Sequence, residues 1–259
     1  MTTPSLPAAI PQPFRPKLAI LAALSIELSG LKSLCTFGPT VFANGFRTWE
    51  ATLEGVPILV VETGVGFRRA EKATQAIIDA YKPTVVLSVG LCGGLNDELP
   101  TGQLILAKSV KRTAGRAITC SQTLRKEDLL ATLNAREVQV ITADAAVTSV
   151  EGKQALRQSS KGDVVDMESF AVVDICHQRQ VKFGVLRVIS DDAKTTLPTG
   201  VMSLIGETGA LRVGALVGTL WHKPSSMVDL WKLRNQSLAC SQTLARGLKQ
   251  VCIFLAGMK

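Results

Sequence analysis

Short apolar runs alternate along the chain with longer segments of helical periodicity. The run from Leu18 to Leu24 is continuously apolar, which is typical of a strand buried on both faces of a sheet. Similar runs predict further strands at 46–53, 56–61, 84–89, 102–110 and 137–143. Helices are predicted from the turn at 62–70 to about Tyr81, and at 126–134, 151–160 and 170–180. This order of elements predicts an α/β protein.

Two apolar segments end in carboxylates, Val164 to Glu168 and Val188 to Asp192. With the helix between them they form a predicted strand–helix–strand unit, and parallel strands place their C-terminal ends at the same edge of a sheet. Glu168 and Asp191 should then lie side by side where open α/β sheets bind ligands. Two carboxyl groups in different surroundings can break a glycosidic bond. The alternative is that these carboxylates only cap helices, which is the role we expect for Asp192.

Two further features belong to the same predicted edge. Residues 25–31 can begin a helix, in which Glu27 either contacts the helix dipole or stands at the mouth of the first strand. The segment Gly90 to Gly94 is a glycine-rich loop that would let the backbone approach a ligand. The glycine turn at 63–66 could cradle an anion, with Arg68 and Arg69 as candidate phosphate ligands or as solvated side chains.

Composition limits the classes of function. The 259 residues are 46% apolar and 5% aromatic, and the net charge of +8 comes from scattered Lys and Arg, which argues against nucleic-acid binding. The six cysteines form no CxxC pair and match no zinc spacing, so we expect buried thiols in a reducing compartment and no metal. The glycine turn also lacks the third glycine of a dinucleotide fingerprint, so no cofactor is expected. These features predict a cytoplasmic protein.

The two ends of the chain differ from the middle. Residues 1–16 carry five prolines and read as a disordered lead-in, followed by an α/β domain over 17–194. Residues 195–259 form a basic helical extension, with seven Lys or Arg against two acidic residues and helices expected at 199–205, 214–222 and 225–256. Trp221 and Trp231 lie beside basic residues there, which suits contact with a membrane surface. The alternative is that the extension packs on the same domain and exposes its basic face to solvent.

In this order the motifs resemble those of the nucleoside phosphorylase/nucleosidase superfamily, whose small-nucleosidase branch contains the methylthioadenosine/S-adenosylhomocysteine nucleosidases. The resemblance runs from about Lys17 to Lys194 and rests on Glu27 after the first strand and on TGVG, SVGLCGGL, TGQLILA, VVDMES and RVISDDA at 63–66, 88–95, 101–107, 164–169 and 187–193. It implies a single domain around a mixed, partly closed sheet. The sequence DMES and the basic tail after DDAKTTLP are similar to hopanoid-biosynthesis-associated members, which are linked to removing adenine from adenosylhopane.

The resemblance also implies roles for residues of this chain. Asp191 would protonate the purine at N7, Glu168 would bind the ribose 2′-OH, and Glu27 would orient or deprotonate the attacking water. The other substrate contacts expected are Val165, Met167, Gly64, Gly66, Leu91, Cys92, Gly93, Ala146 and Ser190.

Three departures from the nucleosidase pattern bear on the substrate. Leu91 stands where the nucleosidases usually have serine, Ala146 where they often have an aromatic residue, and Glu27 alone remains of an acidic cluster. These departures argue against methylthioadenosine and S-adenosylhomocysteine as the main substrates and favour an adenosylhopane-like nucleoside.

Several alternatives stay open at this point. Glu27 favours hydrolysis, because a carboxylate repels phosphate, whereas Arg68 and Arg69 keep phosphorolysis open. A methylthioadenosine/S-adenosylhomocysteine nucleosidase and a general purine nucleoside phosphorylase are the alternative enzymes. The other classes are a nucleoside-binding protein on the same fold and a membrane-surface scaffold. The resemblance further implies a homo-oligomer, most simply a dimer.

Overall fold

The computed structural model describes residues 14–124, 126–197 and 225–258, with the side chains of 225–234 excepted. One ten-stranded mixed sheet organises these residues. At one end, β1 (Leu18–Ala22) lies between two parallel neighbours, β4 (Val56–Glu62) and β5 (Val85–Gly94). The antiparallel strands β3 (Phe46–Leu53) and β2 (Val41–Ala43) extend the sheet beyond β4.

The other end of the sheet closes on itself. Its strands are β6 (Leu104–Arg112), β8 (Arg136–Thr142), β9 (Val164–Asp166) and β10 (Lys182–Asp191), and the short β7 (Ala117–Thr119) pairs with β6. The strand order β10-β6-β8-β9-β5 returns to β10, because β10 also pairs with β5. The expectation of a mixed, partly closed sheet is therefore confirmed. The segment 90–94, expected as a loop, is instead the last half of β5 and lies inside this ring.

The predicted parallel strand–helix–strand unit is wrong in one respect. β10 is parallel to β5 and β9 is antiparallel to it, so β9 and β10 run in opposite directions. Both edges of β9 are already occupied, by β8 and β5, so β10 has to pair on the far side of β5. Glu168, which follows β9, and Asp191, the last residue of β10, both border the interior of the closed ring and do not share one sheet edge.

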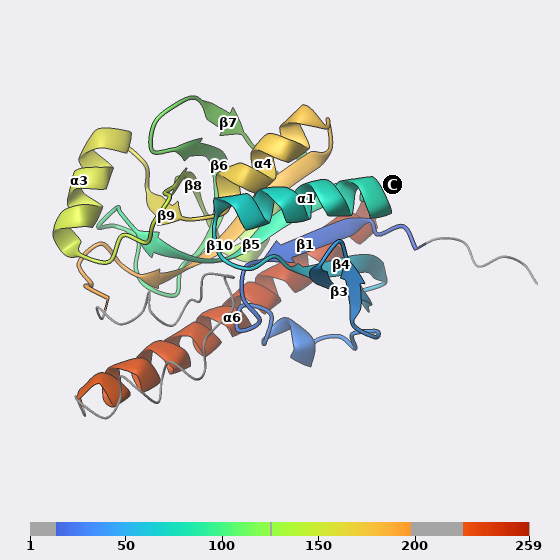
Figure 1. The fold of residues 1–259 in the computed structure, drawn as a ribbon, viewed down its shortest axis with the longest axis horizontal. Coiled ribbons are helices and arrows are strands. Elements are labelled where there is room, and N and C mark those ends of the chain that lie inside the picture. The colour runs from blue at the N-terminus through green and yellow to red at the C-terminus, as the bar shows by residue number, and fades with distance from the viewer. Residues whose placement is uncertain (1–13, 125, 198–224, 259) are drawn as a thin grey trace, which may run out of the picture.

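Helices cover both faces of the sheet (Figure 1). On one face α1 (Phe67–Tyr81) packs beside α4 (Ser169–Gln178), and on the other lies α6 (Ser225–Gly257). Both faces of β1 are buried, which explains its continuously apolar sequence. Ala19 and Leu21 face the core under α1 and α4, and Leu18, Ile20 and Ala22 face the core under α6. The remaining helices are the α-helices α2 (Glu127–Leu133) and α3 (Val150–Ser160) and the 3₁₀ helices η1 (Leu31–Ser33) and η2 (Gln122–Leu124).

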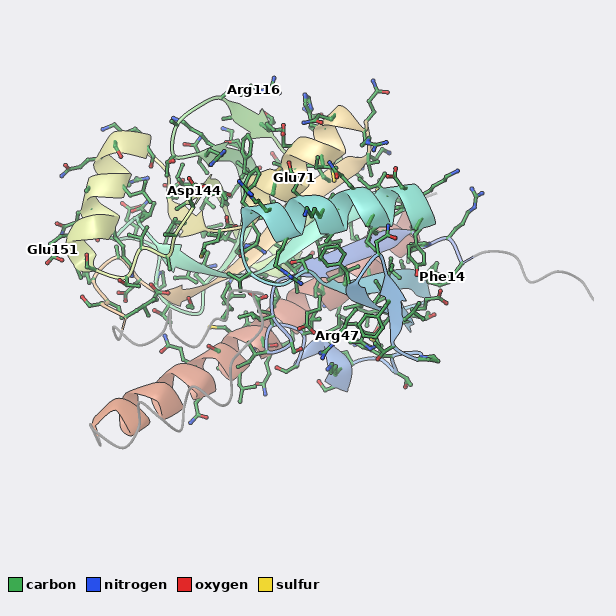
Figure 2. The ribbon with its side chains drawn as sticks, viewed as in Figure 1. Phe14, Arg47, Glu71, Arg116, Asp144 and Glu151 are labelled. Atoms are coloured by element: carbon green, nitrogen blue, oxygen red, sulfur yellow. The ribbon has the colours of Figure 1, made fainter. Side chains whose placement is uncertain are left out.

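Most charged side chains of the described residues are exposed or half-buried. Arg47, Arg116 and Glu151 lie exposed at the periphery (Figure 2). Within the described part of the chain, the buried charged side chains are Glu27, Lys153, Asp166, Arg187 and Asp191. A buried charge is costly unless it is paired, so this small set marks a site. The six cysteines are free thiols, five of them buried and Cys35 half-buried.

The segment after β1 is held by the C-terminal helix and does not form the expected α-helix. It makes turns up to η1, and its Gly30 N–H donates to Ser241 Oγ on α6 at 2.9 Å. The same hydroxyl donates to the carbonyl oxygen of Glu27 at 2.9 Å. Gln236 of α6 donates to the carbonyl oxygen of Ser190. These contacts place α6 against both the Glu27 segment and the end of β10.

Much of the predicted basic extension lies outside the described residues, including the helices expected at 199–205 and 214–222. The side chains of Trp231, Lys232 and Arg234 are also outside them, as are Trp221 and Lys223. The third expected helix is α6, which packs on β5 and β10. In the described ranges, no helix is long and apolar enough to cross a bilayer. The domain boundaries and the membrane contact stay predictions.

Gly30 should tolerate no side chain, because a Cβ there would stand 2.4 Å from the carbonyl oxygen of Ser241. A helix backbone cannot move aside cheaply, so Gly30→Ala is expected to lower the free energy of unfolding by about 1–3 kcal/mol. Gly257 is the matched control, since nothing lies within 4 Å of its added Cβ. Urea denaturation of the two variants measures the difference, and equal midpoints would contradict the packing of α6 on this segment.

Candidate active site

A cavity of about 200 Å³ opens inside the closed part of the sheet. It is bordered by the segment after β1, the C-terminal part of β5, the ends of β9 and β10, and the segment after β8. Its lining consists of Ala23, Leu24, Glu27, Val65, Leu91, Cys92, Gly93, Ala145, Ala146, Val147, Val165, Asp166, Met167, Glu168, Ser190, Asp191 and Leu197. Two wider hollows at the surface, along 32–38 and around 122–128, contain none of the three predicted catalytic carboxylates.

Glu27 is buried at the end of the cavity nearest β1. Its Oε1 accepts a hydrogen bond from the Leu91 N–H at 2.9 Å, and its Oε2 accepts one from the Leu24 N–H at 2.9 Å. Burial raises the pKa of Glu27, and the positive charge of Arg187 opposes that rise. These two hydrogen bonds from backbone N–H groups fix the orientation of the Glu27 carboxylate.

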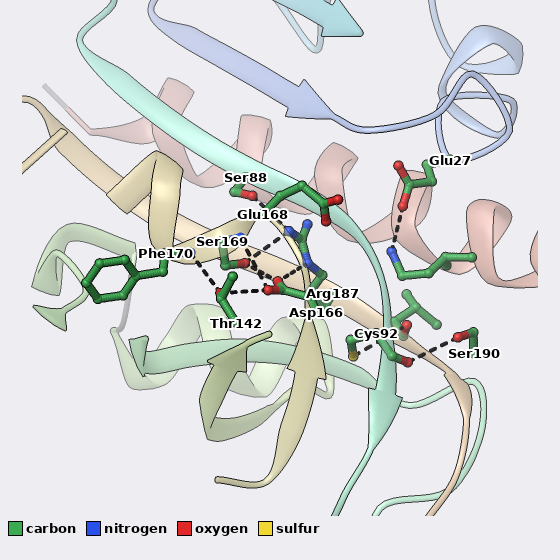
Figure 3. A network of polar contacts seen from close by, with 12 residues as sticks. Glu27, Ser88, Cys92, Thr142, Asp166, Glu168, Ser169, Phe170, Arg187 and Ser190 are labelled. Carbon is green, nitrogen blue, oxygen red and sulfur yellow. Dashed lines mark hydrogen bonds and ion pairs between the residues drawn. The ribbon is translucent and has the colours of Figure 1, made fainter. Parts of the chain in front are cut away.

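Arg187, on β10, is the centre of the polar network (Figure 3). Its Nε donates to Asp166 Oδ2 at 2.9 Å, and its Nη2 donates to Ser88 Oγ at 2.9 Å and to Ser169 Oγ at 3.0 Å. Burial alone would lower the pKa of Arg187, but the carboxylates of Asp166, Glu168 and Glu27 outweigh it and leave that pKa raised. The guanidinium is therefore charged at every working pH.

One nitrogen of this guanidinium remains available. Nη1 of Arg187 is buried and has no hydrogen-bond partner among the described residues. A Cβ on Gly90 would stand 3.1 Å from Nη1 and 2.4 Å from Glu27 Oε1, so a donor and an acceptor border the same point. Gly90 has φ +153°, and any side chain there would fill this point. Glu27 Oε1 and Arg187 Nη1 thus both lie close to the backbone of Gly90.

Glu168 stands at the N-terminal end of α4 and reaches across to α1. Its Oε1 accepts a hydrogen bond from the Gly66 N–H at 2.8 Å. Burial and the negative charge of Asp166 raise the pKa of Glu168 to about 7, against the opposing effect of Arg187. Glu168 therefore changes its charge near neutral pH, as functional carboxyl groups often do.

Asp191 is the last residue of β10 and lies at the other end of the cavity. Its Oδ2 accepts from Lys153 Nζ at 2.6 Å and its Oδ1 from Ser190 Oγ at 2.6 Å. Burial raises the pKa of Asp191, while the hydrogen bond from Lys153 opposes that rise. Asp191 Oδ2 would be 3.2 Å from a Cβ on Gly93, so Gly93 keeps the cavity open beside the carboxyl group.

Gly90 and Gly93 of β5 are bordered by different charged groups. Glu27 and Arg187 border Gly90, and Asp191 borders Gly93. Three residues of strand span about 10 Å. Glu27 and Asp191 therefore border β5 at two different points, and both line the cavity.

The cavity contains most of the residues expected from the sequence. All three predicted catalytic carboxylates line it, with Val165, Met167, Leu91, Cys92, Gly93, Ala146 and Ser190. Gly64, Gly66, Arg68 and Arg69 do not. Gly66 acts through its N–H on Glu168, as described above. Asp192 caps a turn and no described helix, since its Oδ1 accepts from the Lys194 N–H at 3.1 Å and the Thr195 hydroxyl at 2.7 Å.

The two candidate phosphate ligands lie away from the cavity for different reasons. Arg69 Nε donates to the Thr63 carbonyl oxygen at 2.9 Å. Its guanidinium packs over Gly64, whose added Cβ would stand 2.2 Å from Arg69 Nε. Arg68 is exposed on α1. The arginine that does reach the cluster is Arg187.

Sequence reasoning missed Arg187 and Lys153. Arg187 is the one charge in the otherwise uncharged stretch 183–190, and Lys153 lies three residues from both Val150 and Leu156 on one side of a short helix. A charged residue at an apolar position of a periodic pattern is the signal that could have identified them.

Comparison with known proteins places this geometry in a family. The family described as "Phosphorylase superfamily" matches residues 17–217. A 5′-methylthioadenosine/S-adenosylhomocysteine nucleosidase of Shewanella loihica is 26% identical over 228 residues, which cover 80% of this chain and 99% of that protein.

Solved structures of the same fold are also similar. The futalosine hydrolase of Helicobacter pylori has a TM-score of 0.70 at 20% identity, over 91% of this chain and 96% of that one. A mutant of the 5′-methylthioadenosine/S-adenosylhomocysteine nucleosidase of Helicobacter pylori, with 5′-methylthioadenosine in its active site, has a TM-score of 0.69 at 19% identity, over 90% and 98%. The family match covers more than three quarters of the sequence, and the chain belongs to the Phosphorylase superfamily.

Proposed function

We propose that this chain is a nucleosidase that hydrolyses the N-glycosidic bond of a 5′-modified adenine nucleoside and releases adenine. The observation that carries the proposal is the presence of three carboxyl groups in the lining of one cavity, two of them, Glu27 and Glu168, beside the buried Arg187. The similar proteins support it, because their names describe a nucleosidase and a hydrolase.

Asp191 is the proposed proton donor. Adenine is a poor leaving group as an anion and a good one once N7 is protonated. Burial raises the pKa of Asp191, so the carboxyl group can hold a proton for this transfer. The base would lie against the aliphatic side chains of Val165, Val147 and Ala146, which replace an aromatic stacking partner.

Glu168 and Glu27 act on the sugar side. Glu168 would accept a hydrogen bond from the ribose 2′-OH, and its charge would stabilise the oxocarbenium-like sugar as the bond breaks. A water beside Glu27 in the cavity would attack C1′, with Glu27 taking its proton. The charge of Arg187 opposes the effect of burial on the pKa of Glu27 and of Glu168 and so favours their ionised forms.

The same geometry favours hydrolysis over phosphorolysis. A phosphate at the position of the water would be adjacent to Glu27 and Glu168, two carboxylates in a buried site, and would be repelled by both. Arg69 is engaged by Thr63, and Arg68 is exposed on α1 outside the cavity lining. A general purine nucleoside phosphorylase is therefore the weaker alternative.

The 5′ substituent is proposed to be apolar and longer than methylthio, as in adenosylhopane. Leu91, Ala145 and Leu197 line the cavity with aliphatic carbon, and the departures at positions 91 and 146 remove groups that the small nucleosidases use. Methylthioadenosine and S-adenosylhomocysteine are the alternative substrates. The homo-oligomer, the cytoplasmic location and the membrane contact remain predictions from sequence.

The reaction should need no phosphate. Purified protein is incubated with a 5′-alkylthioadenosine, with and without phosphate, and free adenine and the free sugar are measured by chromatography. We expect equal rates and no sugar 1-phosphate, because Glu27 activates water. A strict phosphate requirement would exclude this role for Glu27. In a series from methylthio to decylthio, kcat/KM should rise by up to about fourfold for each methylene that is buried.

Asp191→Asn and Glu27→Gln should each reduce kcat by about 10²–10⁴-fold, the usual contribution of a general acid or base. The matched controls are Asp97→Asn and Glu98→Gln, two exposed carboxylates in the turn after β5. Adenine release is followed by absorbance, and nucleoside affinity by calorimetry. If the unaltered protein bound adenosine derivatives tightly and released no adenine from any of them, the protein would be a nucleoside-binding protein.

Glu168 should make stability depend on pH. Its pKa of about 7 exceeds the ordinary value of 4.5, so its contribution to stability is full below about pH 4.5 and is lost as pH rises through 7. Glu168→Gln removes this loss, and the variant should gain stability relative to the unaltered protein between pH 5 and pH 8. Urea midpoints at the two pH values measure the gain, and Glu98→Gln is the control. A stability difference that did not change with pH would contradict the raised pKa.

A further inference from the structure

Lys153 is a buried lysine in contact with the carboxyl group of Asp191. It lies on α3, its side chain is 0% exposed, and its Nζ donates to Asp191 Oδ2 at 2.6 Å. The same ammonium donates to the carbonyl oxygens of Asp192 at 2.6 Å and Thr195 at 2.8 Å. These three bonds match the three protons of an ammonium group.

Stability alone does not account for this pair. Taking two charges out of water costs several kcal/mol for each, so a buried ion pair is often no better than well-packed apolar side chains. The other buried pair, Arg187 with Asp166, lies within the cluster that would bind sugar and water. Lys153 does not line the cavity, but Asp191, one of its hydrogen-bond partners, does. Its effect on a substrate therefore passes through that carboxyl group.

Among the described groups that face Asp191, Lys153 supplies the positive charge. The others are Asp192, which follows along the chain, Cys92 on β5 and Cys240 on α6. Burial raises the pKa of both thiols, so they stay neutral in the working range. Asp192 carries negative charge and works against ionisation of Asp191.

We propose that Lys153 is a positioning residue for the proton donor: it holds Asp191 in place by Oδ2 and stabilises the carboxylate that forms when the proton moves to the purine. The inference rests on the proposed function. In the transfer, the carboxyl O–H bond breaks, an N–H bond forms on the base, and the negative charge left on Asp191 is balanced by the ammonium. Lys153 keeps its own three protons throughout.

Burial and Lys153 act in opposite directions on the pKa of Asp191, which explains why the lysine is needed. Burial raises the pKa of Asp191, which favours the protonated form that the reaction needs and also makes that form a weaker acid. The charge and hydrogen bond of Lys153 offset part of that rise in pKa. The pKa of Asp191 is thereby brought closer to the pH at which the reaction runs. An acid buried without a counter-charge would hold its proton too tightly.

The test is a pH profile of Lys153→Met. Removing a cation within hydrogen-bond distance should raise the pKa of Asp191 by about one to three units. The alkaline limb of kcat/KM should move to higher pH by the same amount, while kcat at neutral pH falls at least tenfold because a weaker acid donates less readily. Lys153→Arg keeps the charge and should leave the limb near its original position. Lys72→Met, an exposed lysine on α1, is the matched control and should match the unaltered protein.

Other outcomes are equally informative. A loss of activity with an unmoved alkaline limb would show that Lys153 only supports the fold, and unchanged activity would give it no role. If Lys153→Met did not fold, Lys153→Gln should show the same shift, because it donates hydrogen bonds without a charge.

Protonation of Asp191 can also be followed without turnover, from the infrared carboxyl band that is lost in Asp191→Asn. A higher midpoint in Lys153→Met would support the inference even if no adenine nucleoside were hydrolysed, which would disprove the proposed function alone. An unchanged midpoint would overturn the inference.

Discussion

A guanidinium group buried inside a closed ring of strands is the constraint on which the rest of the site depends. Arg187 is 2% exposed, and a cation so deep in a protein requires anions and oxygen acceptors around it. Asp166 supplies the ion pair and is itself held by Thr142 and Ser169. Glu27 and Glu168 then face a fixed positive charge, which offsets the effect of burial on their ionisation. Asp166, Glu27 and Glu168 therefore all interact electrostatically with Arg187 and form one unit with it.

Closure of the sheet brings distant segments of sequence into this unit. Pairing of β10 with both β5 and β6 completes the ring, and β9 enters it between β5 and β8. The functional side chains consequently come from strands of opposite direction and converge inside the sheet. Glycines at 90 and 93 keep the space between them open. Inside this ring lie Asp191, the proposed proton donor, and Glu27, the proposed base for water.

Much of this could be predicted from the sequence because it is local. Apolar runs located the strands, and the carboxylates after three of them identified Glu27, Glu168 and Asp191 as candidates. Strand direction could not be predicted in this way. β8 and β5 occupy both edges of β9, so β10 pairs with β5 on its other side, and only the tertiary structure shows this. Lys153 and Arg187 were missed because a charged residue inside a periodic segment usually reaches solvent, and only tertiary packing shows that these two do not. The expected helix after β1 failed for a similar reason, since contacts with α6 override its local propensity.

The hydroxyl of Ser241 that supports Glu27 belongs to a residue 214 positions later in the chain. A ribosome adds roughly 5–20 residues each second, so the first strand and its glutamate are synthesised about 10–40 s before the helix that holds them. Contacts of such long range also close slowly, because the entropy of a large loop has to be overcome first. During that interval the nascent chain can build most of its sheet without a finished catalytic centre. The support that Glu27 receives from Ser241 is therefore complete only after the C-terminal helix has been synthesised.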